Sequence, residues 1–481
     1  MNLKATLFFA LLGGMSSQTL GAAVDRVDPP NWWVGMADSS LQLMMYGNEI
    51  GSGSLASKSG DVTISQVTSG DSPNYLFVDL TIHADAEPQT VELLYTAADG
   101  TTSAVSYPLH ARREKSSDRQ GFSARDTVYL IMPDRFANGD PSNDTVDHLH
   151  EPADGQHPYG RHGGDLAGIT KNLDYFTELG MTQLWMTPVL ENNQKDSSYH
   201  GYAVTDLYRV DARLGSNSDY VELSRGARKR GIGIIHDFVP NHIGSEHPWM
   251  HDLPPADWIN RHADFSPSNH RRETHQDPYA SDFDKGEMIT GWFVPTMPDL
   301  NQQNPLLATY LIQNILWWIE TADLSGVRVD TWPYNDRVFL SNFTGRVLAE
   351  YPKMSIVGEE WSVNPATIAY WQKGKKNHDG YDSGAPQLMD FPLQEAIREA
   401  VNEEERWDTG LIKLYQVLAD DFLYPDPMGL MLIADNHDMT RLYPGVNDNF
   451  ARTACTSWSG SFTAFRSTSS TKIPRGACAG K

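Results

Sequence analysis

The sequence predicts an α/β protein in which a (β/α)8 TIM barrel follows an N-terminal β-sandwich. Short alternating strand patterns separated by Gly, Ser, Asp and Pro clusters fill residues 24–112. From residue 126 apolar strands alternate with helical patterns, and polar residues gather where each of these strands ends, as on the active face of a barrel. A doubly wound sheet also binds ligands at its strand ends, but the number of strands favours the barrel.

Residues 1–23 are expected to be a secretory signal peptide. Lys4 precedes an apolar run over residues 5–12, and small residues lead to an expected cleavage point near Ala22 or Ala23. The run is too short to span a bilayer, which argues against the alternative of a membrane anchor. We therefore expect export to the periplasm or the exterior.

Composition points to a packed globular protein. The chain has 481 residues, of which 40% are hydrophobic, and its formal net charge is -24. Binding to nucleic acid or anionic lipid requires clustered Lys and Arg, so neither is an expected partner. The two cysteines, Cys455 and Cys478, cannot provide a disulfide framework.

The elements follow in order along the chain. The sandwich strands are predicted at 41–47, 61–67, 75–83 and 90–97, and a polar linker covers 113–125. The barrel is predicted over 126–454, with strands at 127–136, 182–189, 232–239, 326–332, 355–361, 387–391 and 429–438, and helices at 165–180, 219–231 and 304–323. Residues 243–300 lack periodicity and are expected to form a long inserted loop over the active face.

The predicted strand "SGVRVDTWPY" (325–334) carries two charged residues among apolar ones. Side chains alternate along a strand, so Arg328 and Asp330 share one face while Val327 and Val329 share the other. A neighbouring guanidinium favours the charged form of a buried aspartate and fixes its orientation. A structural ion pair is the simpler alternative.

Four segments at strand ends resemble the signature segments of the α-amylase family of glycoside hydrolases, in family order. They are "DFVPNH" (237–242), "GVRVDTWPY" (326–334), "GEEW" (358–361) and "DNHD" (435–438). "MPDLN" (297–301), the sandwich and its opening "NWWVGM" are similar to the cyclomaltodextrinase and neopullulanase branch. The resemblance covers about residues 125–450.

The resemblance implies a catalytic role for three carboxyl groups. Asp330 would be the nucleophile, Glu359 the general acid and Asp438 the carboxylate that supports substrate distortion. Strand alternation alone cannot choose between Glu359 and Glu360 as the acid; the family pattern favours Glu359, directly after the glycine.

Further residues are implied to bind substrate or metal. Tyr202 in "YHGYAVTDLY", His242, His437 and Arg328 would contact the sugar, although a buried tyrosine and structural histidines are the alternatives. The segments "FANGDPSNDT" (136–145) and "HGGD" (162–165) are rich in oxygen ligands of the kind that bind Ca²⁺, and a plain Asn/Asp turn is the alternative. The expected Ca²⁺ ligands are Asn138, Asp140, Asn143, Asp144, Gly163 and Asp165.

The resemblance ends near residue 454, and residues 455–481 form a Ser/Thr-rich tail of different character. We expect a truncation or frameshift there, which leaves the barrel incomplete at its last strand and helix and removes a C-terminal β domain. The resemblance implies a retaining hydrolase of α-1,4-glucosidic bonds in maltodextrins, cyclodextrins, starch or pullulan, and a homodimer by analogy. A transglycosylase on the same site, or an inert glucan-binding protein, are the alternatives.

Overall fold

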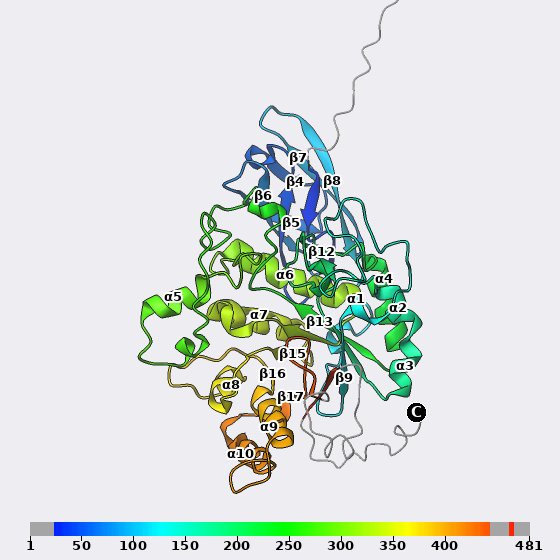
Figure 1. Cartoon of the computed structure of the whole chain (residues 1–481). Coiled ribbons are helices and arrows are strands. Elements are labelled where there is room, and N and C mark those ends of the chain that lie inside the picture. Colours follow the sequence, from blue (N-terminus) through cyan, green and yellow to red (C-terminus); the bar gives the residue numbers. More distant parts are fainter. Residues whose placement is uncertain (1–23, 443–460, 466–481) are drawn as a thin grey trace, which may run out of the picture.

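The computed structural model describes residues 24–442 and the backbone of residues 461–465 (Figure 1). The predicted signal peptide, both cysteines and most of the predicted tail lie outside these residues. The described part consists of a sandwich of two sheets placed on one side of a closed barrel. The fold class predicted from the sequence is therefore confirmed.

The N-terminal part is a β-sandwich of two four-stranded sheets. One sheet has the order β1 (Arg26–Asp28), β3 (Ser40–Tyr46), β6 (Tyr75–Ile82) and β5 (Val62–Ser69). The other has the order β2 (Trp32–Trp33), β8 (Thr102–His110), β7 (Gln89–Thr96) and β4 (Ser54–Ser57). Alternate residues such as Val91, Leu93 and Tyr95 are buried between the sheets, as expected for strands with one solvated face.

Seven parallel strands form most of the barrel. In chain order they are β9 (Thr127–Ile131), β10 (Gln183–Met186), β13 (Gly233–Phe238), β14 (Gly326–Val329), β15 (Ser355–Gly358), β16 (Gln387–Met389) and β17 (Leu430–Ile433). Consecutive strands of this series pair in parallel. All residues of β14 and β15 are buried, because helices cover the outside of the sheet while side chains fill its interior.

The barrel departs from a regular one at its eighth strand. β18 (Ser461–Phe465) pairs antiparallel with both β17 and β9 and closes the barrel. The described residues contain no parallel eighth strand, as the sequence indicates, but an antiparallel strand fills its position, so the edges of β9 and β17 are not left open. The physical reason is that the edges of β9 and β17 carry backbone N–H and C=O groups that need partners, and a short segment of the tail supplies them.

Helices cover the barrel, and most of them begin at a side chain that caps the first turn. They are α1 (Pro133–Phe136), α2 (Leu166–Lys171), α3 (Leu173–Glu178), α4 (Asn217–Arg228), α6 (Pro305–Ala322), α7 (Arg337–Glu350), α8 (Pro365–Trp371), α9 (Phe391–Asn402) and α10 (Ile412–Ala419). The predicted cap of α6 is confirmed, because the Asn304 side chain accepts hydrogen bonds from the backbone of residues 306 and 307. The predicted helix 165–180 is interrupted at Asn172, between α2 and α3.

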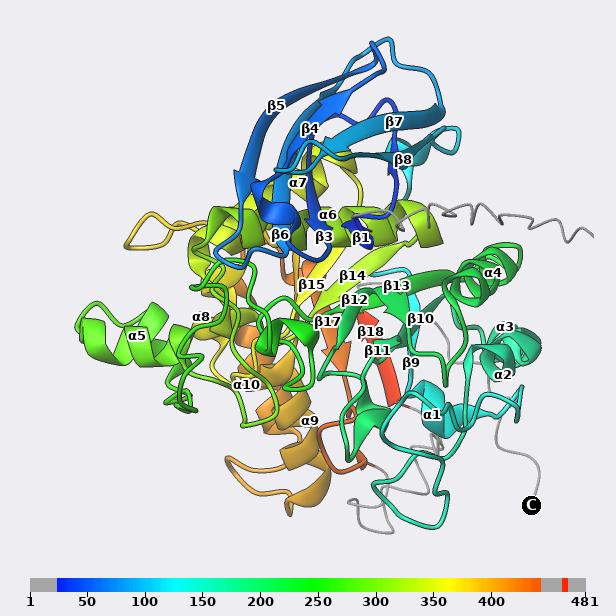
Figure 2. The same cartoon turned by 90° about the horizontal axis from the view of Figure 1, so that it is seen from above.

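The sandwich rests on the barrel through α6, which lies between the two parts in both views (Figures 1 and 2). Gln42 in β3 and Gln313 in α6 exchange two hydrogen bonds, of 2.8 and 2.7 Å. Arg26 in β1 forms bonds of 2.7 and 2.8 Å with Asp206 in β12 (Asp206–Val210), a strand paired with β11 (Leu190–Glu191). The paired side chains fix the sandwich to the barrel surface.

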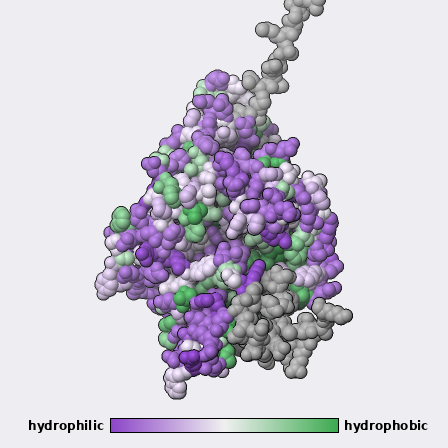
Figure 3. All heavy atoms as spheres, viewed as in Figure 1, coloured by the Kyte–Doolittle hydropathy of each residue, from purple (hydrophilic) through white to green (hydrophobic). Residues whose placement is uncertain are grey.

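The segment between β13 and α6 carries one helix, α5 (Asp282–Thr290), and short helical turns that include η5 (Arg272–His275). Hydrophilic residues cover most of the described surface seen in Figure 3. Among residues 24–442 no helix is both long and apolar enough to span a bilayer.

Candidate active site

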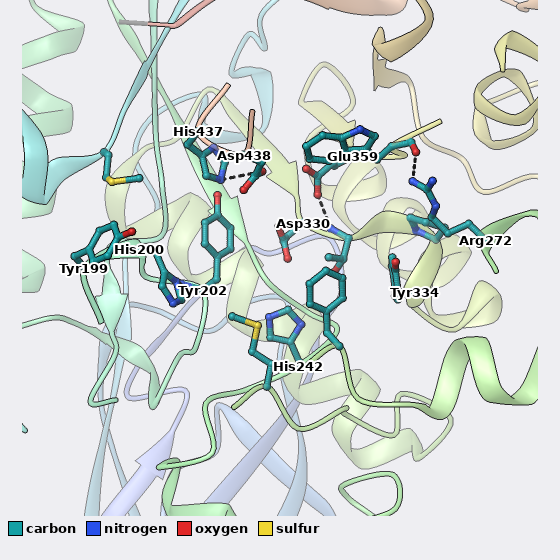
Figure 4. Close-up of a pocket in the computed structure, with 16 residues that line it drawn as sticks. Tyr199, His200, Tyr202, His242, Arg272, Asp330, Tyr334, Glu359, His437 and Asp438 are labelled. Atoms are coloured by element: carbon teal, nitrogen blue, oxygen red, sulfur yellow. Dashed lines mark hydrogen bonds and ion pairs between the residues drawn. The ribbon is translucent and has the colours of Figure 1, made fainter. Parts of the chain in front are cut away.

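A pocket of about 520 Å³ lies where the barrel strands end (Figure 4). It brings together residues that are far apart in the sequence. Those predicted from the sequence are Tyr202, His242, Asp330, Glu359, His437 and Asp438, and the others include Tyr199, His200, Arg272, Phe293, Tyr334 and Trp361. The pocket is therefore built from strand ends and from the inserted segment, as the barrel fold requires of a functional site.

Arg328 is the centre of the charge network beneath this pocket. It is fully buried, and its Nη1 donates to Asp330 Oδ1 at 2.7 Å and to Asp237 Oδ1 at 2.8 Å. Asp237 also accepts hydrogen bonds from Trp185 Nε1 at 2.9 Å and from the Tyr202 hydroxyl at 2.8 Å. Arg328, which the sequence predicts to contact the sugar, does not line the pocket. Its guanidinium instead contacts the carboxyl groups beneath the pocket.

Glu359 meets the same guanidinium from the neighbouring strand. Its Oε1 forms an ion pair with Arg328 Nη2 at 2.7 Å, and its Oε2 accepts from the backbone N–H of Thr331 at 3.0 Å. Thr331 has a φ of 44°, in the left-handed region, directly after Asp330. This turn aims its N–H at Glu359, so the ends of β14 and β15 together hold both carboxyl groups at the pocket.

The two adjacent glutamates point to different places, and only Glu359 lines the pocket. Glu360 is fully buried, and its Oε2 accepts a hydrogen bond from Trp371 Nε1 at 2.9 Å. Alternation along the strand explains the divergence. The geometry therefore agrees with the choice of Glu359 that the family pattern favours.

Burial raises the pKa of both Asp330 and Glu359, and the Arg328 guanidinium opposes the rise at both groups. The attraction that the sequence predicts between Arg328 and Asp330 is present, but the loss of hydration outweighs it. The charge on Asp330 raises the pKa of Glu359 further. The raised pKa of both groups favours a pair that holds one proton and one negative charge between them.

Asp438 and His437 enter the pocket after β17. His437 Nε2 lies 3.3 Å from Asp438 Oδ2, and its ring stacks on that of Tyr202 with 5.3 Å between centroids. Loss of water around the Asp438 carboxyl and the charge of Glu359 raise the pKa of Asp438 to about 7, although 40% of its side-chain surface stays exposed. Burial lowers the pKa of His437 to about 3, so its ring is neutral.

His242 lines the opposite part of the floor with an unused ring nitrogen. Its Nδ1 contacts the Asn241 side chain at 3.2 Å, whereas its buried Nε2 has no hydrogen-bond partner among the described residues. Burial lowers the pKa of His242 to about 4, so the imidazole is neutral. A buried polar atom that faces a pocket and lacks a partner is suited to bind a hydroxyl group of a ligand.

Sequence reasoning gave no role to several residues of the site. Asp237 was recognised only as a polar residue at a strand end, yet it shares Arg328 with Asp330. Arg272 and Phe293 come from the inserted segment, which has no periodic pattern that could have marked them. Tyr334 lies within the quoted segment "GVRVDTWPY" and could have been found from it.

The predicted calcium loop is assembled beside α1 and α2. Asn138 Nδ2 donates to Asp144 Oδ1 at 2.8 Å, and a Cβ atom added at Gly163 would lie 2.8 Å from the same oxygen. The buried Oδ1 of Asn143 has no hydrogen-bond partner among the described residues. These oxygens would fit a hard cation that accepts amide, carboxylate and backbone ligands.

Two predicted ligands of this loop have structural partners. Asp165 accepts from the backbone N–H groups of residues 139, 140 and 168 and caps α2. Asp140 accepts from both the backbone and the hydroxyl of Ser142. No group of three or more His, Cys, Asp or Glu side chains suited to a metal ion occurs among the described residues, so amide and backbone oxygens would have to complete this site.

The fold and the site together define a class: a (β/α)8 barrel that holds an ionisable pair of carboxyl groups at its strand ends. The family model described as "Alpha amylase, catalytic domain" matches residues 130–463, and that described as "Cyclomaltodextrinase, N-terminal" matches residues 26–113. The chain belongs to the alpha-amylase family, in its cyclomaltodextrinase and neopullulanase branch.

Curated relatives support this assignment. The chain is 30% identical over 337 residues to neopullulanase 2 of Thermoactinomyces vulgaris, covering 68% of this chain and 52% of the relative. It is 30% identical over 282 residues to a cyclomaltodextrinase of Geobacillus thermopakistaniensis, covering 58% and 44%. A beta/alpha-amylase of Paenibacillus polymyxa is 28% identical over 334 residues, covering 67% and 25%. The chain thus spans between a quarter and about half of these relatives.

Solved structures give the same result. An alpha-amylase from Geobacillus thermoleovorans in complex with acarbose is 33% identical, with a TM-score of 0.54, over 69% of this chain and 65% of that one. An alpha-amylase from Anoxybacillus is 31% identical, with a TM-score of 0.55, over 70% and 66%. In both cases about a third of the solved chain has no counterpart here.

Proposed function

We propose that this chain is a retaining hydrolase of α-1,4-glucosidic bonds in maltodextrins, cyclodextrins, starch or pullulan. The observation that carries the proposal is the pair of buried carboxyl groups, Asp330 and Glu359, held by the one guanidinium of Arg328 at a pocket on the strand ends. Retaining glycosidases need two carboxyl groups about 5 Å apart, one ionised and one protonated. A single guanidinium that contacts both groups is consistent with such a short separation.

In the first step the Asp330 carboxylate attacks the anomeric carbon of the glucose unit in the pocket. The bond from that carbon to the glycosidic oxygen breaks, and Glu359 transfers its proton to this oxygen, so the remainder of the glucan leaves as an alcohol. The product of this step is a glycosyl ester of Asp330. Both carboxyl groups line the pocket, and burial raises the pKa of each, which supports a pair that holds one proton between its two members.

In the second step a water molecule takes the place of the departed glucan. The Glu359 carboxylate removes a proton from the water, the oxygen attacks the anomeric carbon, and the ester bond to Asp330 breaks. Two displacements at the same carbon restore the α configuration. A sugar hydroxyl in place of water would give transglycosylation with the same residues.

The neutral ring nitrogens and Asp438 are proposed to bind the sugar during both steps. His242 Nε2 has no partner among the described residues, and His437 lies beside Asp438. The stacked pair of Tyr202 and His437 forms a flat wall for the apolar face of a sugar ring. Hydrogen bonds that shorten as the ring flattens would stabilise the transition state more than the bound substrate.

Calcium, export and dimer formation are also proposed for this protein. The residues that would hold Ca²⁺ are Asn138, Asp140, Asn143, Asp144, Gly163 and Asp165, and the ion would stabilise the loop between α1 and α2. The apolar run in residues 5–12 supports export. The homodimer is carried over from the family by analogy; sedimentation of the purified chain would test it.

The test of the proposed activity is release of reducing sugar from β-cyclodextrin, starch and pullulan by the purified chain. We expect release that falls at least about 10⁴-fold in Asp330→Asn, because an amide cannot form the glycosyl ester. Release that persists unchanged in this variant would refute the proposal. If neither protein releases sugar while starch still retards the chain on a native gel, the chain is a glucan-binding protein instead.

A further inference from the structure

Glu360 is a buried carboxyl group in which only one of the two oxygens accepts a hydrogen bond from the described residues. Its side chain is fully buried, and only its Oε2 accepts a well-formed hydrogen bond, from Trp371 Nε1 at 2.9 Å. Its Oε1 has no hydrogen-bond partner among the described residues and lies 3.4 Å from Arg272 Nη1. Burying a carboxyl group with half of its acceptors unused is unfavourable, so the position calls for a functional reason.

Arg272 connects this buried carboxyl group to the pocket. It begins η5 in the inserted segment, lines the pocket, and donates through Nη1 to the backbone carbonyl of Trp361. The structure shows no partner for its Nε and Nη2 within the described residues. These N–H groups can therefore donate to a ligand.

The segment that carries Arg272 is anchored to the ends of β14 and β15. His275 Nε2 contacts the backbone carbonyl of Pro333 at 2.6 Å, and His270 Nδ1 contacts the Tyr334 hydroxyl at 3.0 Å. The His275 ring also meets that of Trp371, with 5.0 Å between centroids. The inserted segment is thus a built wall of the pocket, and Arg272 is its only cation that lines the pocket among the described residues.

The wall stands on a defined side of the reacting groups. Figure 4 shows Arg272 and Tyr334 on one side of Asp330 and Glu359, with Tyr202 and His437 on the other. In the proposed function Tyr202 and His437 bind the sugar whose bond is cleaved. Arg272, next to the strand end that carries the general acid, therefore lies on the side where the leaving glucan departs.

We propose that Arg272 is a specificity-determining residue that binds hydroxyl groups of the leaving glucose unit, and that Glu360 is a positioning residue that holds its guanidinium. This inference rests on the proposed function. Nη1 of the planar Arg272 guanidinium contacts Glu360 and the Trp361 carbonyl, which leaves Nε and Nη2 to donate to the substrate. Arg272 would also retain the leaving glucan, or a new acceptor sugar, next to the glycosyl ester of Asp330.

The test compares two substrates that share the same cleaved sugar but differ in the leaving group. When maltotetraose is cleaved, the leaving group is a sugar that Arg272 can bind. When α-maltosyl fluoride is cleaved, the leaving group is fluoride, which has no hydroxyl groups. Arg272→Ala should lower kcat/KM for maltotetraose about 10- to 100-fold, the effect of losing hydrogen bonds to a charged donor. The same variant should leave kcat/KM for α-maltosyl fluoride within about 2-fold of the wild-type value.

Arg271→Ala is the matched control, because Arg271 is exposed, adjacent in sequence and carries the same charge. It should behave as the wild type on both substrates. Glu360→Ala, which removes both oxygens that can accept from Arg272, should reproduce a smaller part of the Arg272→Ala loss on maltotetraose, and the double variant should show no loss beyond that of Arg272→Ala. Arg272→Ala should also lower the ratio of transfer to hydrolysis products.

Equal losses on both substrates would overturn the inference, because they would show that Arg272 supports the whole site rather than the leaving sugar. No loss on either substrate would overturn it as well. If the wild type and Arg271→Ala cleave neither substrate, the proposed function fails, and this inference fails with it. The fluoride assay thereby separates the failure of the inference from the failure of the function.

Discussion

Replacing Glu360 by glutamine removes a buried ionisable group while keeping its shape, and it should change how stability depends on pH. Burial raises the pKa of Glu360 from an ordinary 4.5 to about 8, and the opposing attraction of Arg272 is the smaller effect. In the folded chain the group therefore keeps its proton at pH values where the unfolded chain has lost it.

The sign and size of the effect follow from this difference. Because the pKa is raised in the folded state, the stabilising contribution of protonated Glu360 is fully present below pH 4.5, where the group is protonated in both the folded and the unfolded chain. It is lost as the pH rises toward about 8, since the folded state must then bury a charge. A shift of about 3.5 pKa units, at about 1.36 kcal/mol each, corresponds to about 5 kcal/mol in the free energy of unfolding.

Urea unfolding, followed by tryptophan fluorescence between pH 4.5 and pH 9, measures this free energy. The difference between Glu360→Gln and the wild type should shift by about 5 kcal/mol in favour of the variant across this range. Glu404→Gln is the control, because the Glu404 side chain is 81% exposed and should give a difference independent of pH. A constant difference for Glu360→Gln as well would refute the reasoning that burial keeps this carboxyl group protonated.

Three further predictions concern the site and the metal loop. Glu359→Gln should lose most of its activity on maltotetraose but much less on α-maltosyl fluoride, whose leaving group needs little protonation; equal losses in steady-state assays would contradict the role of Glu359 as acid. Because burial raises the pKa of Asp330 and the nucleophile must be ionised, kcat/KM should fall with decreasing pH at values above the usual aspartate range. An acid limb at or below pH 3.8, the ordinary aspartate pKa, would speak against this. Removing Ca²⁺ with a chelator should lower Tm, and Asp144→Ala should abolish that sensitivity; a Tm unaffected by chelation in the wild type would rule out the metal site.

Much of the catalytic site could be predicted because strand geometry determines it. Arg328 and Asp330 alternate with apolar residues on a short strand, and this pattern alone places both on the same face. The motif order brought Glu359 and Asp438 to the same end of the barrel, where the structure finds them. These predictions depend on local periodicity and on the rule that parallel strands end at one face.

The rest depends on contacts between distant segments, which periodicity does not report. Arg272 lies in an aperiodic insertion and reaches the pocket only because η5 is anchored at Pro333 and Tyr334. The antiparallel strand β18 was not predicted, because its pairing is set by the open edges of β9 and β17 rather than by its own sequence. The upward direction of the Asp330 pKa likewise follows from burial, which composition cannot measure.

Whether Asp330 forms a covalent bond to the sugar is tested most directly by mass spectrometry of a trapped intermediate. The purified chain would be mixed with an α-maltosyl fluoride carrying a second fluorine beside the ring oxygen, which slows hydrolysis of the glycosyl ester. We expect the chain to gain the mass of one glycosyl group, located on the peptide that contains Asp330, and no gain in Asp330→Asn. A label on another residue, or fluoride release in Asp330→Asn at the wild-type rate, would contradict the assignment of Asp330 as nucleophile.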